Sequence, residues 1–414
     1  MESSVAVETA KHSVQVFAYI LAIGLFSGVL AQKAKIPDVA VFLLMGMLVG
    51  PQMTGWVDIS SDSAINQGIL ILGASYILFD GGASLRLKVL SEVWITITII
   101  STVGILITGI ITAGAAYYIL QIPFIIALLL GSVIASTDPA TLVPVFRQVP
   151  IKDRVAQTVM SESAFNDAMG AIITFSLLGV AMGSGEFSLG NALFNLFKES
   201  FIGIVTGALC GYLIALLIAH EKYNFLAEYA AVAILMAIIT AYMAADALHA
   251  SGFMAVFVFG IIIGNKESLG FTMAHKEELK LENYILTTAL IMRTFIFILL
   301  GAQVDFGLMN QYLGGGVLVV LIFMLVARPA TVFLCAGPDR RAKWSKNELL
   351  FMCWTRETGV IPGALAGMLV GMKAPGAPII ASITFIAILM TILVQATTTA
   401  WLGDKLGLLD MEKD

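Results

Sequence analysis

The sequence predicts an all-α polytopic membrane protein with about thirteen transmembrane helices, and three observations support this prediction. First, 59% of the 414 residues are hydrophobic and only 12% are charged, and the mean hydropathy is +0.94. Second, apolar runs of roughly 17–25 residues, long enough to cross a bilayer as a helix, recur along the chain. Third, the basic residues alternate between successive connecting segments, as expected for loops on opposite sides of a membrane.

The apolar windows place the spans in order along the chain, with the second and ninth windows shorter than the rest. We expect helices over residues 13–31, 36–50, 64–80, 92–119, 124–147, 154–182, 192–219, 225–246, 249–264, 282–301, 313–335, 346–371 and 377–402.

The basic residues test this assignment independently, because cytoplasmic loops retain Lys and Arg. Of the 23 basic residues, 17 follow odd-numbered spans, and only Lys11, Lys198 and Lys373 lie on the opposite side; the remaining three lie within predicted helices. The sequence therefore predicts an external N-terminus and a cytoplasmic C-terminus. Basic residues after the first apolar segment favour a retained first helix over a cleaved signal peptide. Since few residues follow the last span, we expect no soluble regulatory domain.

Four polar side chains within 30 positions lie inside or beside the fifth and sixth predicted spans: Asp138, Glu162, Asn166 and Asp167. An acid at the middle of a spanning helix costs ~2.5–3.5 kcal/mol on insertion scales, so acids held there usually line a cavity that handles ions or protons. Transport of a cation or a proton is therefore the first functional hypothesis.

Pro139 breaks the fifth span near Thr137, because proline lacks an N–H and crowds the preceding turn. Backbone freed at membrane depth is stable only where protein or a wet cavity satisfies it, and freed carbonyls bind cations. The sixth span is predicted to be continuous, with Ser163 and Asp167 on one face at i, i+4. Together with the Thr137 carbonyl, these side chains would supply hard oxygen ligands for a small monovalent cation. A simple kink and a purely structural aspartate stay open as alternatives.

A second interrupted segment lies at residues 355–363, within the twelfth predicted span. If the seventh span is a linker, spans 1–6 and 8–13 form two six-helix halves of inverted orientation, and the broken fifth and twelfth spans correspond. Paired broken helices in inverted halves indicate a midplane binding site in a secondary transporter. Coincidence stays open as the alternative, because Gly and Pro are common in transmembrane helices.

Two arginines, Arg328 and Arg356, lie where an unpaired guanidinium is costly, so each requires an anion. Glu162 is the favoured partner of Arg328, which leaves Asp138 and Asp167 available for chemistry. The alternative is that either arginine extends its charged group to the membrane interface.

Asp80 stands beside two glycines at the end of the third span. It would either line the entrance to the site or mark a helix end at the surface. The three cysteines have no metal-ligand spacing, and the chain contains no Walker loop, dinucleotide-binding fingerprint or nucleophile elbow. We therefore expect no enzymatic activity, no cofactor, no nucleic-acid partner and no ATP-driven pumping by this polypeptide.

Four segments together resemble the monovalent cation:proton antiporter-1 family, which includes the NhaP-type sodium/proton antiporters and the animal sodium/hydrogen exchangers. They occur in the family's order and spacing, and the likeness covers nearly the whole chain. The segments are Thr137-Asp138-Pro139, residues 161–167 (SESAFND), residues 326–329 (VARP) and the segment around Arg356.

The resemblance implies a single transmembrane antiporter domain over residues 1–414, which assembles as a homodimer in the plasma (inner) membrane. Two inverted six-helix repeats would make up this domain, with the two broken helices crossing each other. Helices 1–3 and 8–10 would form the dimerisation scaffold, and helices 4–6 and 11–13 the mobile ion-translocating core.

The resemblance also implies ion coordination by the Thr137 carbonyl and by the side chains of Asp138, Ser163 and Asp167. Asn166 would be held by Glu162 and by an arginine that matches Arg328, and Asp80 would ligate through water. The chain departs from its relatives at Arg356, which Glu-Thr-Gly follows where Gly-Ala is common, and at Arg293, where several relatives have an acid.

These features predict a secondary antiporter that exchanges one Na⁺ or Li⁺ for one H⁺ and serves pH homeostasis. Burial raises the proton affinity of an aspartate and a bound cation lowers it, so the two would compete for Asp167. With Asn166 in place of a second acid, exchange should be electroneutral. A K⁺/H⁺ antiporter of the same fold is the alternative. A sodium-driven symporter, a passive cation channel and a non-transporting scaffold explain fewer of the features.

Overall fold

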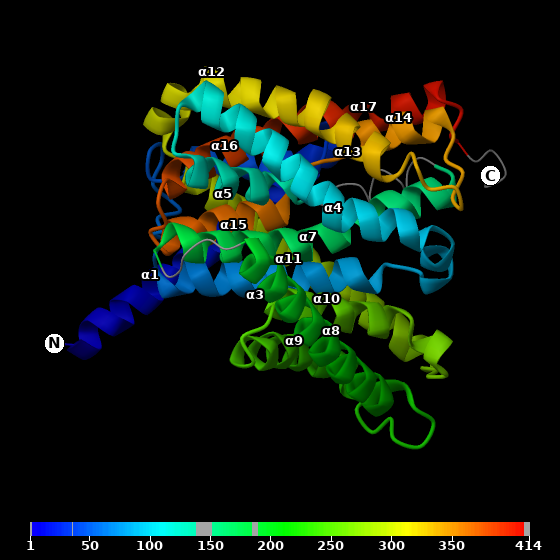
Figure 1. Cartoon of the computed structure of the whole chain (residues 1–414). Coiled ribbons are helices and arrows are strands. Elements are labelled where there is room, and N and C mark those ends of the chain that lie inside the picture. The colour runs from blue at the N-terminus through cyan, green and yellow to red at the C-terminus, as the bar shows by residue number, and fades with distance from the viewer. Residues whose placement is uncertain (1, 35, 138–150, 184–188, 410–414) are drawn as a thin grey trace.

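The computed structural model describes residues 2–34, 36–137, 151–183 and 189–409 (Figure 1). Within these ranges the regular elements are helices, and one isolated antiparallel β-bridge joins Ile151 to Leu409. Nine helical segments of the described chain are long and apolar enough to cross a membrane, and four shorter apolar helices accompany them. The predicted fold class, all-α and membrane-spanning, is confirmed.

The helices follow one another along the chain with short connections. Their bounds are α1 (Glu2–Ala34), α2 (Asp38–Val49), α3 (Ala64–Ala83), α4 (Leu87–Leu120), α5 (Phe124–Ala135), α7 (Asp153–Ala181), α8 (Leu189–Ala219), α9 (Ala230–Ala247), α10 (Gly252–Gly264), α11 (His275–Ala302), α12 (Phe306–Ile322), α13 (Arg328–Cys335), α14 (Lys346–Trp354), α15 (Val360–Gly371), α16 (Ala377–Met390) and α17 (Thr397–Lys405).

Each predicted window contains a helix, but some ends differ. The largest differences at helix starts are those of α1, at Glu2 instead of residue 13, of α11, at His275 instead of residue 282, and of α12, at Phe306 instead of residue 313. The segments added to α1 and α11 are polar, and hydropathy windows detect only the apolar part of a helix. The two inverted repeats stay a prediction.

Two of the predicted spans are interrupted. α5 ends at Ala135, and Ser136 continues in extended conformation (φ −71°, ψ 146°); Asp138, Pro139 and the rest of this predicted span lie outside the described residues. The twelfth predicted span consists of α14 and α15, separated by the non-helical residues 355–359. Pro362 does not cause this second break, because it lies in the first turn of α15, where proline is tolerated.

Two π-helical turns lie inside long helices of the C-terminal half. The first, η3 (Phe323–Ala327), joins α12 to α13 and directly precedes Arg328. The second, η4 (Thr391–Ala396), joins α16 to α17 and contains the buried residues Thr391 and Gln395. Such turns are rare and occur frequently at functional sites.

The helices pack as a bundle from which one group of helices projects (Figure 1). α8, α9 and α10 contact one another and form that group, and α10 also packs along α3. The seam between α3 and α10 is very close, because a Cβ added at Gly260 or Gly264 would overlap the carbonyl oxygens of Phe79 and Ala83. The backbones of α3 and α10 are therefore in direct contact along this seam.

Candidate functional site

The interrupted end of α5 meets the middle of α7 at Asp167. This carboxylate is 1% exposed, and its Oδ1 accepts a hydrogen bond from the Ser136 hydroxyl. Ser163 lies one turn earlier on α7, with its Oγ 2.9 Å from the Thr137 hydroxyl oxygen. The structure therefore brings Asp167, Ser163 and Thr137 together, whereas Asp138 lies outside the described residues.

Asn166 clamps the backbone where α5 ends. Its Oδ1 accepts a hydrogen bond of 3.0 Å from the Thr137 N–H, and its Nδ2 donates one of 2.9 Å to the Thr137 hydroxyl. The amide thus satisfies an N–H that the helix break leaves free, as a buried backbone group requires. The resemblance had implied that Glu162 and Arg328 hold Asn166. The structure differs: within its described residues Asn166 bonds to Thr137, because the two Glu162 oxygens face arginines.

Glu162 forms a two-pronged ion pair with Arg328. Arg328 Nη1 lies 2.5 Å from Oε1 and Nη2 lies 2.7 Å from Oε2, and Arg356 Nη1 lies 3.7 Å from the same Oε1. The three residues are at most 2% exposed, so neither arginine extends to the interface. Bidentate geometry of this kind is the strongest arrangement of a carboxylate and a guanidinium. One carboxylate thus faces two guanidinium groups, and the Arg356 guanidinium also interacts electrostatically with Asp167.

The same two arginines cap the C-terminal ends of α5 and α14, the helices that precede the two breaks. Arg356 Nη2 donates to the carbonyl of Ala135, the last residue of α5. Arg328 Nε donates a 2.9 Å hydrogen bond to the carbonyl of Met352, in the last turn of α14. A helix C-terminus carries unpaired carbonyls and a partial negative charge, and a guanidinium satisfies both. Glu162 therefore links the ends of both broken helices through their arginines.

Asp80 lies in the last turn of α3 and is partly buried. Its backbone carbonyl accepts a hydrogen bond from the N–H of Ser84, which caps the helix. This position is compatible with both alternatives, an acid at the entrance to the site and a helix end at the surface, and its ligation through water stays a prediction.

Sequence reasoning missed Ser136 as a partner of Asp167. Its hydroxyl could have been considered, because it stands directly before Thr137 in a segment already predicted to be non-helical. Together, Ser136, Thr137, Ser163 and Asp167 place hydroxyl and carboxylate oxygens around one point in the middle of the bundle. Hard oxygen donors with a single carboxylate suit a monovalent cation.

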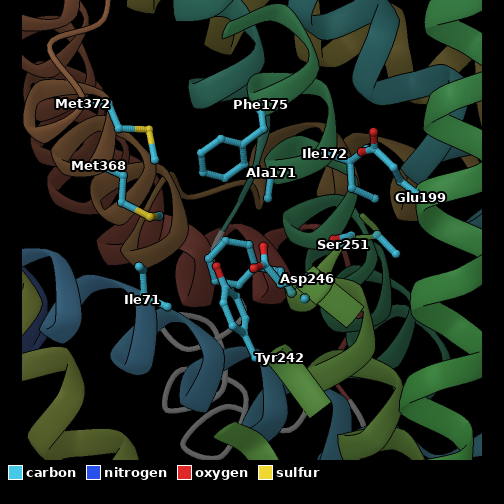
Figure 2. Close-up of a pocket in the computed structure, with 13 residues that line it drawn as sticks. Ile71, Ala171, Ile172, Phe175, Glu199, Tyr242, Asp246, Ser251, Met368 and Met372 are labelled. Atoms are coloured by element: carbon cyan, nitrogen blue, oxygen red, sulfur yellow. The ribbon is translucent and has the colours of Figure 1, made fainter. Parts of the chain in front are cut away.

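A cavity of about 250 Å³ lies near this point. Ala171, one turn beyond Asp167 on α7, is part of its wall, together with side chains from α3, α8, α9, α10 and α15. Figure 2 shows the carboxylates of Glu199 and Asp246, the Tyr242 ring and two methionines around the cavity. The lining comes from segments far apart in the sequence, so no local pattern predicted it.

Comparison with known proteins identifies the family. The family model described as sodium/hydrogen exchanger, transmembrane, matches residues 18–405. The chain belongs to the sodium/hydrogen exchanger family. This agrees with the resemblance seen in the sequence.

Relatives within the sodium/hydrogen exchanger family are similar over most of the chain. The Na⁺/H⁺ antiporter 1 of Methanocaldococcus jannaschii is 32% identical, over 84% of this chain and 80% of the relative. The K⁺/H⁺ antiporter NhaP of Alkalimonas amylolytica is 27% identical, over 87% of this chain and 60% of the relative. The solved structure of the sodium/proton antiporter MjNhaP1 from M. jannaschii superposes with a TM-score of 0.82 and 30% identity, covering 98% of this chain and 99% of that one.

Proposed function

We propose that this exchanger moves Na⁺ and H⁺ in opposite directions, one for one, through competition for Asp167. The observation that carries the proposal is a nearly unexposed carboxylate at mid-helix, surrounded by hydroxyl oxygens at the end of a broken helix. The relatives named as Na⁺/H⁺ antiporters support it.

Na⁺ and H⁺ exclude each other because the Asp167 carboxylate for which they compete is buried. An ionised carboxylate in an apolar environment is costly, and either a proton or a cation removes that cost. Ser136 donates its hydroxyl hydrogen to Asp167 in the present arrangement. A hydroxyl can rotate its hydrogen away and offer a lone pair, so Ser136 joins Thr137 and Ser163 as a ligand when a cation replaces the proton. Asp138, outside the described residues, completes the proposed set.

The stoichiometry follows from Asn166. Both functional atoms of its amide bond to Thr137, so this position carries no charge through the cycle. Asp167 then provides one negative charge, which one Na⁺ or one H⁺ neutralises, and exchange is electroneutral. The unloaded, charged site is retained on one side by the cost of desolvation.

We propose that the site moves as part of a core made of α4, α5, α7 and α12–α17, against a scaffold of α1–α3 and α9–α11. The hydrogen-bond and ion-pair partners described above for Asp167 and Glu162, namely Ser136, Arg328 and Arg356, belong to the proposed core. The direct backbone contact between α3 and α10 supports a scaffold in which these two helices move together. Dimerisation through this scaffold, a plasma-membrane location, an external N-terminus and a role in pH homeostasis complete the proposal. The cycle requires no cofactor and involves no enzymatic step.

K⁺ is the second candidate cation, because a similar chain is named as a K⁺/H⁺ antiporter. Purified protein in proteoliposomes with an imposed pH gradient should accumulate ²²Na⁺ but not ⁸⁶Rb⁺. Accumulation of ⁸⁶Rb⁺ alone would assign K⁺ instead. A pH gradient that drives neither ion would contradict antiport and favour a channel or a symporter.

A further inference from the structure

A second group of buried polar side chains lies at the break between α14 and α15, and the proposed exchange does not use it. Glu357 and Thr358 in this break are both 0% exposed, and Gln395 on the facing π-helical turn η4 is 1% exposed. A carboxylate, a hydroxyl and an amide are thus fully enclosed within the same part of the bundle.

Two hydrogen bonds align this break with the helix opposite. The Thr358 N–H donates to the Thr391 hydroxyl oxygen at 3.0 Å, and Trp354 Nε1 donates to the Thr398 hydroxyl oxygen at 2.8 Å. The two segments run antiparallel, because the lower number on one pairs with the higher on the other. Gln395 lies between the two anchors, one turn from Thr391 and on the same helix face. It therefore faces the stretch around residues 356–357.

Two of these three groups, the Thr358 hydroxyl and the Gln395 amide, lack hydrogen-bond partners within the described chain. For Gln395 this holds of both the oxygen and the nitrogen of the amide. Buried side-chain polar atoms are satisfied in the large majority of cases, and an exception requires an explanation such as a bound ion or water. The Asn166 amide at the first break, in contrast, forms hydrogen bonds through both its oxygen and its nitrogen.

The chemistry of these groups favours a cation. The Glu357 carboxylate, the Thr358 hydroxyl and the Gln395 carbonyl are hard oxygen donors. One carboxylate matches a monovalent ion, whereas protein sites for divalent ions usually gather more oxygen ligands or more carboxylates. The neighbouring guanidinium of Arg356 does not take this place, because its Nη atoms are directed to Ala135, Thr108 and Glu162.

We propose that Glu357, Thr358 and Gln395 form a second site for a monovalent cation, separate from Asp167. The cation links the break to η4. It satisfies the buried oxygens of Gln395 and Thr358, as hydrogen bonds within the protein satisfy Asn166 and Thr137. This site does not depend on the proposed exchange at Asp167.

Equilibrium binding of ²²Na⁺ to the purified full-length protein in lipid nanodiscs tests the proposal. Wild type should bind two Na⁺ per protomer, Glu357→Gln and Asp167→Asn one each, and the double variant none. Gln395→Leu should weaken the second site by about tenfold or more, since a tenfold change corresponds to the loss of a single good polar contact. ⁸⁶Rb⁺ binding, measured in parallel, extends the test to a larger ion.

Gln303→Leu is the matched control. The Gln303 amide already donates to the Ile59 carbonyl and to Asn66, so this variant should still bind two Na⁺. Thr358→Val provides a second test if Glu357→Gln does not yield folded protein, as judged by size-exclusion chromatography.

The proposal is overturned if Asp167→Asn abolishes all saturable binding of both ions, or if Glu357→Gln and Thr358→Val bind as many ions as wild type. Two bound Na⁺ without proton-driven exchange would contradict the proposed function alone. Exchange with a single bound Na⁺ per protomer would contradict this inference alone.

Discussion

The two helix breaks, at residues 136–137 and at residues 355–359, have the same framework but different polar chemistry. In each, an arginine from elsewhere in the chain donates to a carbonyl in the last turn of the helix that precedes the break, and a threonine N–H donates to a side-chain oxygen on a facing helix. At the first break, the facing side chain is Asn166, whose amide bonds through both its oxygen and its nitrogen. At the second, it is Thr391, and the amide of the nearby Gln395 has no hydrogen-bond partner among the described residues.

This comparison distinguishes the groups that stabilise a helix break from the groups that handle ions there. The arginine caps and the threonine N–H bonds occur at both breaks, so they maintain non-helical backbone in the membrane. The carboxylates differ: Asp167 is attached to the first break through Ser136, whereas Glu357 belongs to the second break itself. We therefore expect substitutions of the shared framework to reduce stability, and substitutions of the carboxylates to change ion handling.

The largest expected effect comes from Asp167→Asn, which should lower proton-driven Na⁺ uptake by at least about a hundredfold. An amide can neither take up a proton nor neutralise a cation, so the competition disappears. Glu357→Gln, the matching change at the second break, should retain most of the exchange. Equal losses in proteoliposome assays of the two variants would remove the distinction between the breaks.

The next effect concerns Glu162, which serves both breaks. Glu162→Ala leaves two buried guanidinium groups without their carboxylate, and removal of one member of a buried pair costs about 3–5 kcal/mol. We expect a correspondingly large fall in Tm, measured on purified protein. The double variant Glu162→Met, Arg328→Met should recover part of the lost Tm, because apolar side chains then replace the ion pair. A Tm within error of wild type for Glu162→Ala would contradict the linking role.

A smaller effect is expected at the two threonine N–H bonds. An unsatisfied buried donor costs about 1–3 kcal/mol. Asn166→Leu removes two partners of Thr137, and Thr391→Val removes one partner of Thr358, so the first variant should be the less stable. Thr397→Val is the control, because Thr397 is exposed and its hydroxyl donates to carbonyls of the preceding turn, Leu393 and Val394. The reverse order of Tm values would show that the second break is the more tightly held.

The smallest effect concerns the loop that leads into the second broken helix. Burial alone would raise the pKa of Asp339, but hydrogen bonds from Thr96, Ala342 and Arg341 outweigh it and hold the pKa below its ordinary value of 3.8. Its ionised form therefore stabilises the fold above that value, and this contribution is lost as pH falls through the lowered pKa.

Asp339→Asn tests this contribution through unfolding measured from neutral to acidic pH. The variant should be less stable than wild type at neutral pH, and the two curves should converge in acid. A constant difference at every pH would show that shape, not charge, matters at Asp339.

The sequence predicted the helices well because their main signal, an apolar run of membrane length, is local. It also indicated Asp167, Ser163 and Thr137, since an acid and a break in an apolar run are visible without a structure. What it could not show is which partner each polar group chooses. The attachment of Ser136 to Asp167, and the arginine caps on Ala135 and Met352, depend on helices that meet only in three dimensions.

The contact of Asn166 shows the same limit. The family likeness implied that Glu162 and an arginine hold Asn166. Glu162 and Asn166 lie one turn apart on α7, so a contact between them was geometrically reasonable. The structure instead aims Glu162 at the arginines and Asn166 at Thr137. Small differences in side-chain direction on one helix decide this, and no sequence pattern encodes them.

The seam between α3 and α10 has a practical consequence for watching the protein at work. Because Gly260 and Gly264 bring two backbones into direct contact, these helices cannot slide or rotate against each other without collision. A pair of spectroscopic labels across this seam should report one constant separation under every ionic condition. This label pair can therefore serve as an internal distance reference, against which the displacement of a label on α7 is measured.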